Sequence, residues 1–218
     1  MNTDNYLNIK TFLLPNVTLI AVSKTKPIHA ILNLYNTGER NFGENRVQEL
    51  IEKYEYLPKD IHWHLIGHLQ TNKVKFIAPF VHLIHSVDSF KLLEEINKQA
   101  GKNKRIINCL LQIYIAKEDT KFGFSFEEAE QLMYSEELKN LTNIKIVGLM
   151  GMATNTEKTE QIRAEFKSLA AFFNKHKNFQ FSIFNLQFLS MGMSSDYQIA
   201  IEEGSNMIRV GSLIFGER

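Results

Sequence analysis

Lys24 is the residue of this chain with the clearest chemical potential. It follows an apolar run of strand character, Val17–Ser23, and precedes Pro27. Proline has no backbone N–H to donate, so a central strand cannot continue through it. The pattern predicts that Lys24 lies at the carboxyl end of a buried strand, where parallel α/β proteins place their chemistry. A partly desolvated lysine amine is nucleophilic and forms Schiff bases with aldehydes. A solvated lysine at a strand–helix junction is the alternative interpretation.

Two glycine–serine pairs follow other predicted strands, namely Gly192 with Ser194 and Gly211 with Ser212. Glycine lets backbone N–H groups approach an anion closely. Arg209 comes just before the second pair and adds a positive charge. If the strand ends meet at one edge, these residues and the lysine would suit an aldehyde that carries a phosphate. A tight turn is the alternative interpretation of each pair taken alone.

Histidines and carboxylates do not form a recognisable catalytic set. His62 and His64 share one face of a predicted strand, and His68 follows in a loop, without a cysteine or carboxylate at ligand spacing. We therefore favour hydrogen-bonded histidines in or near the core over a metal site. Glu44 and Asp88 occupy helix-start positions, which the helix dipole favours for acids. We find no acid pair for glycosidases, no Ser/His/Asp arrangement and no nucleotide-binding loop.

Short apolar runs alternate with amphipathic stretches along the whole chain, without a linker or a low-complexity tract. The predicted strands are Val17–Ser23, Arg40–Gly43, His62–Ile66, Val81–Ser86, Arg105–Ile115, Ile144–Met150, Asn185–Ser190 and Met207–Val210. The predicted helices are Ile28–Asn36, Glu44–Tyr54, Leu69–Phe76, one from an N-cap at Asp88 to Gly101, one with a Ser125/Glu128 capping box, Glu157–His176 and Asp196–Glu203. Such alternation predicts a single α/β domain over residues 1–218, a closed (β/α)₈ TIM barrel.

Composition narrows the classes of partner and the compartment. The chain has 218 residues, 44% of them hydrophobic, and a formal net charge of +1. This balance gives no electrostatic reason to expect nucleic acid or an anionic membrane as a partner. The lone cysteine, Cys109, fits a reducing cytoplasm, and no signal peptide or membrane-length apolar run is visible. We therefore expect a cytoplasmic protein.

A series of motifs runs in order from about residue 17 to the C-terminus. They are A-V-S-K-T-K-P (21–27), F-G-E-N (42–45), W-H-L-I-G-x-L-Q-x-N-K (63–73), H-S-V-D (85–88), G-L-M (148–150), L-S-M-G-M-S-x-D (189–196) and I-R-V-G-S-L-I-F-G-E-R (208–218). With these motifs the chain resembles the pyridoxal phosphate homeostasis proteins. That family is similar in fold to the N-terminal barrel of alanine racemase and lacks the racemases' C-terminal β-domain.

The resemblance implies a cofactor, pyridoxal 5′-phosphate (PLP), held as an internal Schiff base on Lys24. It implies phosphate contacts from Ser194 and from the backbone of Gly211 and Ser212. Arg209 matches the arginine that faces the pyridine nitrogen in racemase-like sites. Two positive charges would repel, so that nitrogen stays unprotonated and the cofactor is a weaker electron sink. Other positions that match the pocket lining are Asn45, Ser86 and Met150.

The chain departs from the family pattern in a few places. Arg46 stands where the family usually has tyrosine, and His68 occupies the variable place of its motif. The segment before Val17 looks shorter than usual, which predicts only a partial helix at the barrel bottom. Lys121 lies in a loop where the family also has a lysine. A secondary PLP or anion contact is conceivable there, but we favour a solvated side chain.

The resemblance leaves the question of catalysis open between three hypotheses. Two-base racemisation needs a second base, and Tyr197, the tyrosine nearest the inferred site in sequence, is poorly placed for it. We therefore expect a non-catalytic PLP carrier that buffers the aldehyde and supplies it to apo-enzymes, and a monomer because the racemases' second domain is missing. A PLP-dependent racemase or lyase with an unrecognised substrate is the alternative. A barrel without cofactor, acting through a protein partner, is the third.

Overall fold

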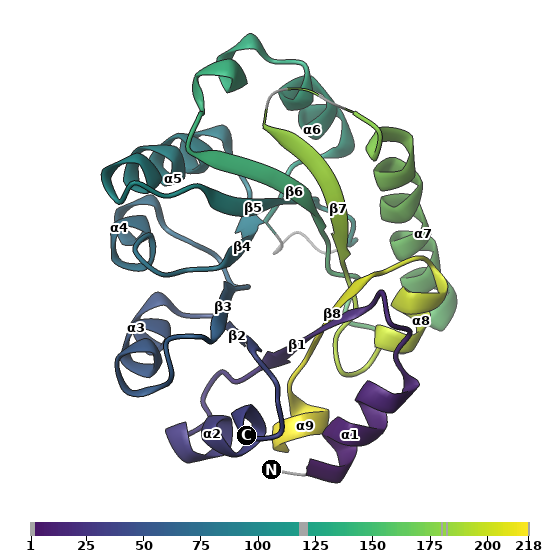
Figure 1. Ribbon diagram of the computed structural model, residues 1–218. Helices are drawn as coiled ribbons and strands as arrows, with labels where there is room; N and C mark the ends of the chain where they lie inside the picture. Colours follow the sequence, from purple (N-terminus) through teal and green to yellow (C-terminus); the bar gives the residue numbers. More distant parts are fainter. Residues whose placement is uncertain (1–2, 118–121, 180, 182, 218) are drawn as a thin grey trace.

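A closed parallel barrel forms the centre of the molecule. The computed structural model describes residues 3–117, 122–179, 181 and 183–217. Each strand pairs with its neighbours in sequence, and β1 closes the barrel against β8 (Figure 1). The strands are β1 (Thr18–Val22), β2 (Asn41–Glu44), β3 (His62–Leu65), β4 (Leu83–Val87), β5 (Ile107–Gln112), β6 (Ile144–Met150), β7 (Phe184–Ser190) and β8 (Met207–Val210). The predicted (β/α)₈ architecture is confirmed.

Helices surround the barrel on its outer face (Figure 1). They are α1 (Thr3–Phe12), α2 (Ile28–Tyr35), α3 (Val47–Tyr56), α4 (Val74–Ile77), α5 (Phe90–Lys102), α6 (Phe126–Met133), α7 (Thr159–His176), α8 (Tyr197–Glu202) and α9 (Ser212–Phe215), with 3₁₀ turns η1 (Thr71–Lys73) and η2 (Glu136–Asn140). Within the described ranges, none of these helices combines the length and apolar character that crossing a bilayer requires.

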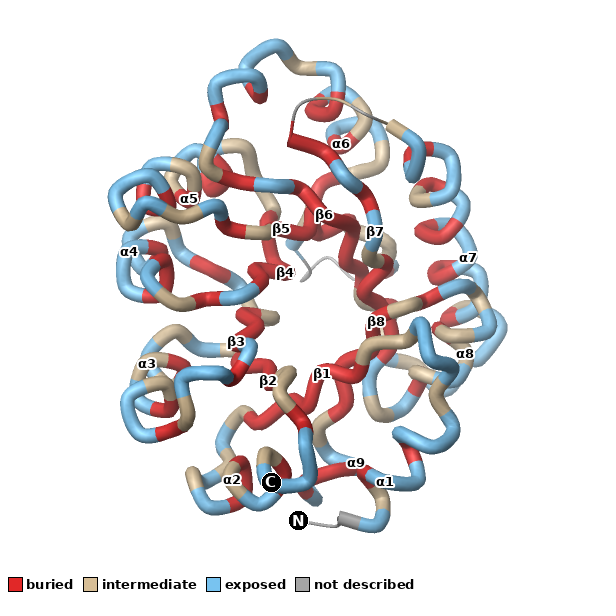
Figure 2. Tube along the Cα trace, viewed as in Figure 1, coloured by how far each residue is buried: buried red, intermediate tan, exposed pale blue. Residues whose placement is uncertain are grey.

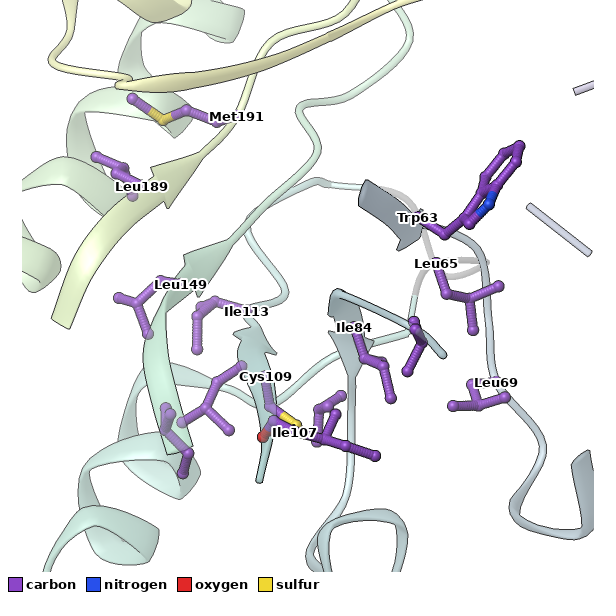
Figure 3. Close-up of a cluster of buried hydrophobic side chains, with 14 of the residues drawn as sticks. Trp63, Leu65, Leu69, Ile84, Ile107, Cys109, Ile113, Leu149, Leu189 and Met191 are labelled. Atoms are coloured by element: carbon purple, nitrogen blue, oxygen red, sulfur yellow. Dashed lines mark hydrogen bonds between the residues drawn. The ribbon is translucent and has the colours of Figure 1, made fainter. Parts of the chain in front are cut away.

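Side-chain alternation along the strands builds a core on each face of the sheet. On β1, Leu19 and Ala21 join the large cluster between sheet and helices, whereas Ile20 joins a smaller cluster with Leu83 and Met207. Figure 3 shows part of the large cluster, and buried residues follow the strands in Figure 2. Both faces of the sheet are covered, and the strands also carry buried polar residues, among them His64, His85 and Arg209.

Capping chemistry decides where two of the helices begin. The Ser125 hydroxyl accepts from the Glu128 N–H at 3.1 Å, and the Glu128 carboxylate accepts from the Ser125 N–H at 2.8 Å. The predicted capping box of α6 is therefore confirmed. The predicted N-cap at Asp88 is wrong, because Ser89 occupies that place and its hydroxyl accepts from the Leu92 N–H.

Some element boundaries differ from the prediction. Strand β5 ends at Gln112, three residues before the predicted Ile115, because the chain there turns to pair with Phe124. Helix α5 includes Gly101 and ends at Lys102 rather than stopping at the glycine. These differences move no residue of the predicted site.

The N-terminal segment forms a helix that is anchored to the barrel. Tyr6 and Ile9 of α1 are buried, and the Asn5 side-chain amide donates to the Leu213 carbonyl of α9 at 3.0 Å. The segment was predicted to provide only a partial helix, yet α1 has 10 residues and a buried face. Helix α1 therefore links the bottom of the molecule to the segment that follows β8.

Candidate functional site

A cavity of about 420 Å³ opens where β1, β2 and β8 end. This volume lies within the range that small-molecule sites occupy. The residues that line it are Val22, Lys24, Asn45, Ile66, Met152, Met193, Ser194, Ser195, Arg209, Gly211 and Ser212. Parallel strands deliver their carboxyl ends to one face of a barrel, so residues nearly 190 positions apart in sequence share one wall.

Lys24 follows β1 and lies half-buried in the cavity wall. The next residue, Thr25, has a φ of 63°, in the left-handed region that β-branched residues avoid. Its backbone N–H donates to the Glu49 carboxylate of α3. On the other side of Lys24, the Ser23 hydroxyl donates to Glu44 Oε1 at 2.6 Å. Contacts to two carboxylates thus hold the turn that carries the lysine.

A buried lysine, Lys53 of α3, ties these contacts together. Its ammonium donates to the Ser23 carbonyl at 2.6 Å, to Glu44 Oε1 at 2.7 Å and to Glu49 Oε1 at 2.6 Å. Burial raises the pKa of Glu44 to about 7, against the opposing effect of the Lys53 charge. We call Ser23, Glu44, Glu49 and Lys53 the Lys53 cluster. It braces the backbone on both sides of Lys24.

Arg209 of β8 brings a buried guanidinium to the cavity. One of its terminal nitrogens donates to the carbonyl and the hydroxyl of Ser190 at 2.8 and 2.7 Å, and the other donates to the Gly151 carbonyl at 3.1 Å. Burial lowers the pKa of Arg209 to about 10, and the charge of Asp196 acts in the opposite direction. The side chain is therefore a fixed cation at neutral pH.

Serine and glycine residues form the wall beside Lys24. Gly211 donates its N–H to the Ser194 hydroxyl at 3.2 Å, and a Cβ at Gly211 would lie 3.0 Å from the Val22 carbonyl. Gly192 has a φ of 97°, which glycine adopts without strain. The described lining offers one amine, one guanidinium and several hydroxyls, without a carboxylate. This donor set suits an anionic ligand with an electrophilic group, which is the chemistry of PLP.

Comparison with known proteins identifies the family. The family model described as alanine racemase, N-terminal domain, matches residues 3–218. The pyridoxal phosphate homeostasis protein of Aquifex aeolicus is 42% identical over 201 residues, which cover 92% of this chain and 86% of that protein. The chain belongs to the pyridoxal phosphate homeostasis protein family. The member from Synechocystis is 38% identical over 218 residues, covering 98% of this chain and 97% of its own.

Solved structures of the pyridoxal phosphate homeostasis protein family and of alanine racemases share the barrel. PipY of Synechococcus elongatus, solved without PLP, is 36% identical with a TM-score of 0.92, covering 99% of this chain and 100% of its own. PipY with PLP bound is 36% identical, with a TM-score of 0.87 and coverage of 98% and 99%. An alanine racemase of Clostridium difficile is 16% identical with a TM-score of 0.76, covering 99% of this chain and 55% of its own. That last likeness concerns the fold alone.

The structure brings together six of the eight predicted site residues of this family member. Lys24, Asn45, Ser194, Arg209, Gly211 and Ser212 all line the cavity. Ser86 does not line it, because it is buried and its hydroxyl donates to the Gly67 carbonyl at 2.5 Å. Met150 is fully buried in the small cluster inside the barrel.

Sequence reasoning did not assign to the site Ser195 or four apolar lining residues, which are Val22, Ile66, Met152 and Met193. Met152 lies two positions after Met150, so the alternation of an extended chain places both on the same side. Extending the alternation past the end of β6 would have found it. Ile66 directly follows β3 and belongs to the same motif as His64. No sequence signal distinguishes Met193 from its neighbours.

The histidines on β3 and around β4 lie close to one another but do not line the cavity of Lys24. His64 Nδ1 lies 3.0 Å from His85 Nε2, and His62 stacks on the ring of His82. His68 hydrogen-bonds through Nδ1 to Asp88 at 2.9 Å. Among the residues that the structure describes, no group of three or more His, Cys, Asp or Glu side chains could hold a metal ion.

Two departures from the family pattern have clear places in the fold. Arg46 is exposed just before α3 and lines a separate surface hollow with Lys26 and Tyr56, a hollow whose lining does not include Lys24. His68 stacks on the ring of Phe122, with ring centroids 4.5 Å apart. Lys121, the loop lysine considered for a secondary anion contact, lies outside the described residues.

Proposed function

We propose that this chain binds PLP as a Schiff base on Lys24 and holds it as a non-catalytic carrier within the cell's vitamin B6 pool. The observation that carries the proposal is the shared cavity of Lys24 and Arg209, walled by Ser194, Gly211 and Ser212. PLP-bound PipY, a structural neighbour at 36% identity, supports the choice of ligand. The relatives' names support the role in homeostasis.

Each lining group has a part in this proposal. The half-buried amine of Lys24 would condense with the aldehyde of PLP and release water, while the hydroxyls of Ser194 and Ser212 and the backbone of Gly211 would hold the phosphate. PLP supplies an aldehyde and an electron-withdrawing ring. The fixed cation of Arg209 would lie against the pyridine nitrogen and would keep that nitrogen unprotonated, because two adjacent positive charges repel. The ring is then a weaker electron sink than one whose nitrogen is protonated, a property that carriage and racemase-like chemistry share.

The absence of a second base in the wall supports carriage rather than turnover. In the described part of the lining, Lys24 and Arg209 are the only ionisable side chains. Racemisation needs a group that delivers a proton to the face opposite the lysine. Asn45, Met152 and Met193 cannot do so. We propose that the protein releases PLP to apo-enzymes and works as a monomer in the cytoplasm.

The first experiment tests the cofactor and its lysine. Purified protein is titrated with PLP, reduced with borohydride and digested, and the modified peptide is located by mass spectrometry. We expect a visible absorption band and a reduced adduct on Lys24, both lost in Lys24→Ala. Lys26→Ala, which changes the nearest lysine in sequence, should keep both. An adduct that persists in Lys24→Ala would overturn the assignment.

A second experiment separates carriage from catalysis. Loaded protein is mixed with an apo-enzyme while a phosphatase removes free PLP, and recovery of the apo-enzyme's activity is followed. We expect recovery that equal free PLP does not give under these conditions. Incubation with amino acids in deuterated water should give no exchange at Cα. Exchange that depends on Lys24 would instead establish the racemase or lyase alternative. Sedimentation of the loaded protein tests the monomer.

A further inference from the structure

A line of hydrogen bonds crosses the inside of the barrel, starting at Arg209. The guanidinium donates to the Ser190 hydroxyl at 2.7 Å, and that hydroxyl lies 3.1 Å from His85 Nδ1. His85 Nε2 lies 3.0 Å from His64 Nδ1, and His64 Nε2 lies 3.3 Å from Asn41 Oδ1. These residues belong to β8, β7, β4, β3 and β2. The line therefore involves five of the eight strands and crosses the interior of the barrel between β7 and β4.

The line continues from Asn41 to Glu39, which precedes β2, and from there to helix α1. The Asn41 side-chain amide donates to Glu39 Oε1 at 3.2 Å. The other oxygen of Glu39 accepts from the Tyr6 hydroxyl at 2.9 Å and pairs with Lys10 at 3.2 Å. Glu39 is 2% exposed. A buried cation at the cavity is thus connected to a buried carboxylate beneath α1.

The direction of the bonds is set from the carboxylate end. A guanidinium only donates, so the Ser190 hydroxyl accepts from Arg209, and its own hydrogen is available to donate to His85 Nδ1. At the far end, a carboxylate only accepts, so the nitrogen of the Asn41 amide faces Glu39 and its oxygen faces His64. His64 Nε2 must therefore carry a hydrogen.

The two histidines in the middle then have one neutral arrangement. His64 carries its hydrogen on Nε2 and accepts at Nδ1, and His85 donates from Nε2 and accepts at Nδ1 from Ser190. The Glu39 end sets these tautomers, and the Ser190 hydroxyl can donate to match them. Burial lowers the pKa of His64 and His85 well below the ordinary range, so both rings are neutral. The neighbouring charges of His82 and Arg209 act in the same direction.

We propose that this relay, Arg209–Ser190–His85–His64–Asn41–Glu39, holds the Arg209 guanidinium in place and stabilises its charge. Ser190 and His85 are then positioning residues that act on the cofactor through Arg209, an inference that rests on the proposed function. Aligned hydrogen bonds polarise one another, so the carboxylate of Glu39 makes the Ser190 oxygen a better acceptor. Arg209 thereby stays charged although its side chain is buried.

Nitrogen NMR of the PLP-free protein tests the relay independently of the cofactor. Long-range nitrogen–proton correlation distinguishes a ring nitrogen that carries hydrogen from one that does not. We expect hydrogen on Nε2 and a bare Nδ1 for both His64 and His85, unchanged between pH 8 and pH 6. The opposite tautomer, or an imidazolium, at either ring would overturn the relay. This measurement needs no variant and therefore does not depend on a mutant folding.

Ser190→Ala breaks the link between Arg209 and His85 with little change of volume. We expect the His85 Nδ1 resonance to shift and PLP affinity to fall about tenfold, the effect of losing one buried hydrogen bond to a charged group. Ser205→Ala is the matched control, because it removes a buried hydroxyl that bonds Leu189, Met191 and Met207 outside the relay. It should leave both His85 and the affinity unchanged.

The two experiments distinguish the possible failures. An unchanged affinity in Ser190→Ala, with the tautomers as expected, would overturn the positioning role. If wild-type protein forms no borohydride-reducible adduct, the proposed function fails, and the tautomers of the PLP-free protein still decide whether the relay exists.

Discussion

Two buried polar groups support the cavity, and they are chemically unlike. The relay lies inside the barrel and passes through neutral imidazoles to reach Arg209. The Lys53 cluster flanks Lys24 and packs an ammonium against the carboxylates of Glu44 and Glu49. The arginine, which must stay charged, is surrounded by neutral acceptors. Beside Lys24, two carboxylates are bound to the buried ammonium of Lys53.

The two groups also respond to pH in opposite directions. Burial lowers the folded-state pKa of His64 and His85, so the unfolded chain binds more protons and stability is lost as the pH falls below about 6.5. Burial raises the pKa of Glu44 to about 7, so the folded chain binds more protons and stability is lost as the pH rises from 4.5 to about 7. Comparing each variant with wild type at the same pH separates the two contributions.

The largest effect is expected when the Lys53 cluster loses its cation. Lys53→Met leaves the carboxylates of Glu44 and Glu49 without their ammonium, and Glu44 Oε2 is already buried without a hydrogen-bond partner. We expect a loss of about 3–5 kcal/mol in the free energy of unfolding, measured by urea denaturation. Lys53→Met with Glu44→Leu should recover at least half of it. A single-variant loss below about 1 kcal/mol would contradict this view of the cluster.

A somewhat smaller effect on stability is expected at acidic pH when a histidine of the relay is replaced. His64→Leu removes one of the rings that must stay neutral in the folded protein. The difference in free energy of unfolding between wild type and His64→Leu should shrink by about 2–3 kcal/mol between pH 7 and pH 4.5. Only wild type must keep the His64 ring neutral in the folded state at low pH, so only wild type loses that stability. Urea denaturation across that range measures it. Ser205→Ala, which removes no titratable group, should show a constant difference from wild type.

The Lys53 cluster should show the opposite trend on the alkaline side. Glu44→Gln keeps the shape of the side chain but cannot ionise, so it avoids the cost of a buried charge. Relative to wild type it should gain about 2 kcal/mol between pH 5 and pH 8, as the sign of the Glu44 shift requires. If Glu44→Gln instead lost stability relative to wild type between pH 5 and pH 8, the charge of Lys53 would outweigh burial, and Glu44 would be ionised well below pH 7.

Much of the fold was predictable because local and global signals agree. The predicted ranges of β6 and β8 are those of the structure, since apolar runs bounded by turns define buried parallel strands. Helix α9 was not predicted because it has only four residues, and α1 was predicted only as a partial helix because its main signal is two buried residues, Tyr6 and Ile9. The positions of α1 and α9 are set by their contacts with the rest of the fold rather than by an amphipathic pattern in the sequence.

The site was predictable only as far as the strand ends. Lys24 and Arg209 each end or nearly end a strand, and the barrel closes them onto one face. The relay was not predictable, because His85 and Ser190 are 105 residues apart and the register of β3, β4 and β7 decides whether they meet. The same holds for Lys53, which looks like a solvated helix lysine until α3 packs on the barrel.

The smallest effect is expected at the outer end of the relay. Lys10 is 43% exposed and pairs with Glu39, which is also bonded to Tyr6 and Asn41. Lys10→Ala should cost about 0.5 kcal/mol, because the Lys10 ammonium is partly solvated and Glu39 keeps its bonds to Tyr6 and Asn41, and should leave the His64 and His85 tautomers unchanged. Urea denaturation and nitrogen NMR measure these two quantities. A changed tautomer would show that the surface charge of α1 sets the direction of the relay, whereas an unchanged one assigns that role to the buried contacts of Glu39.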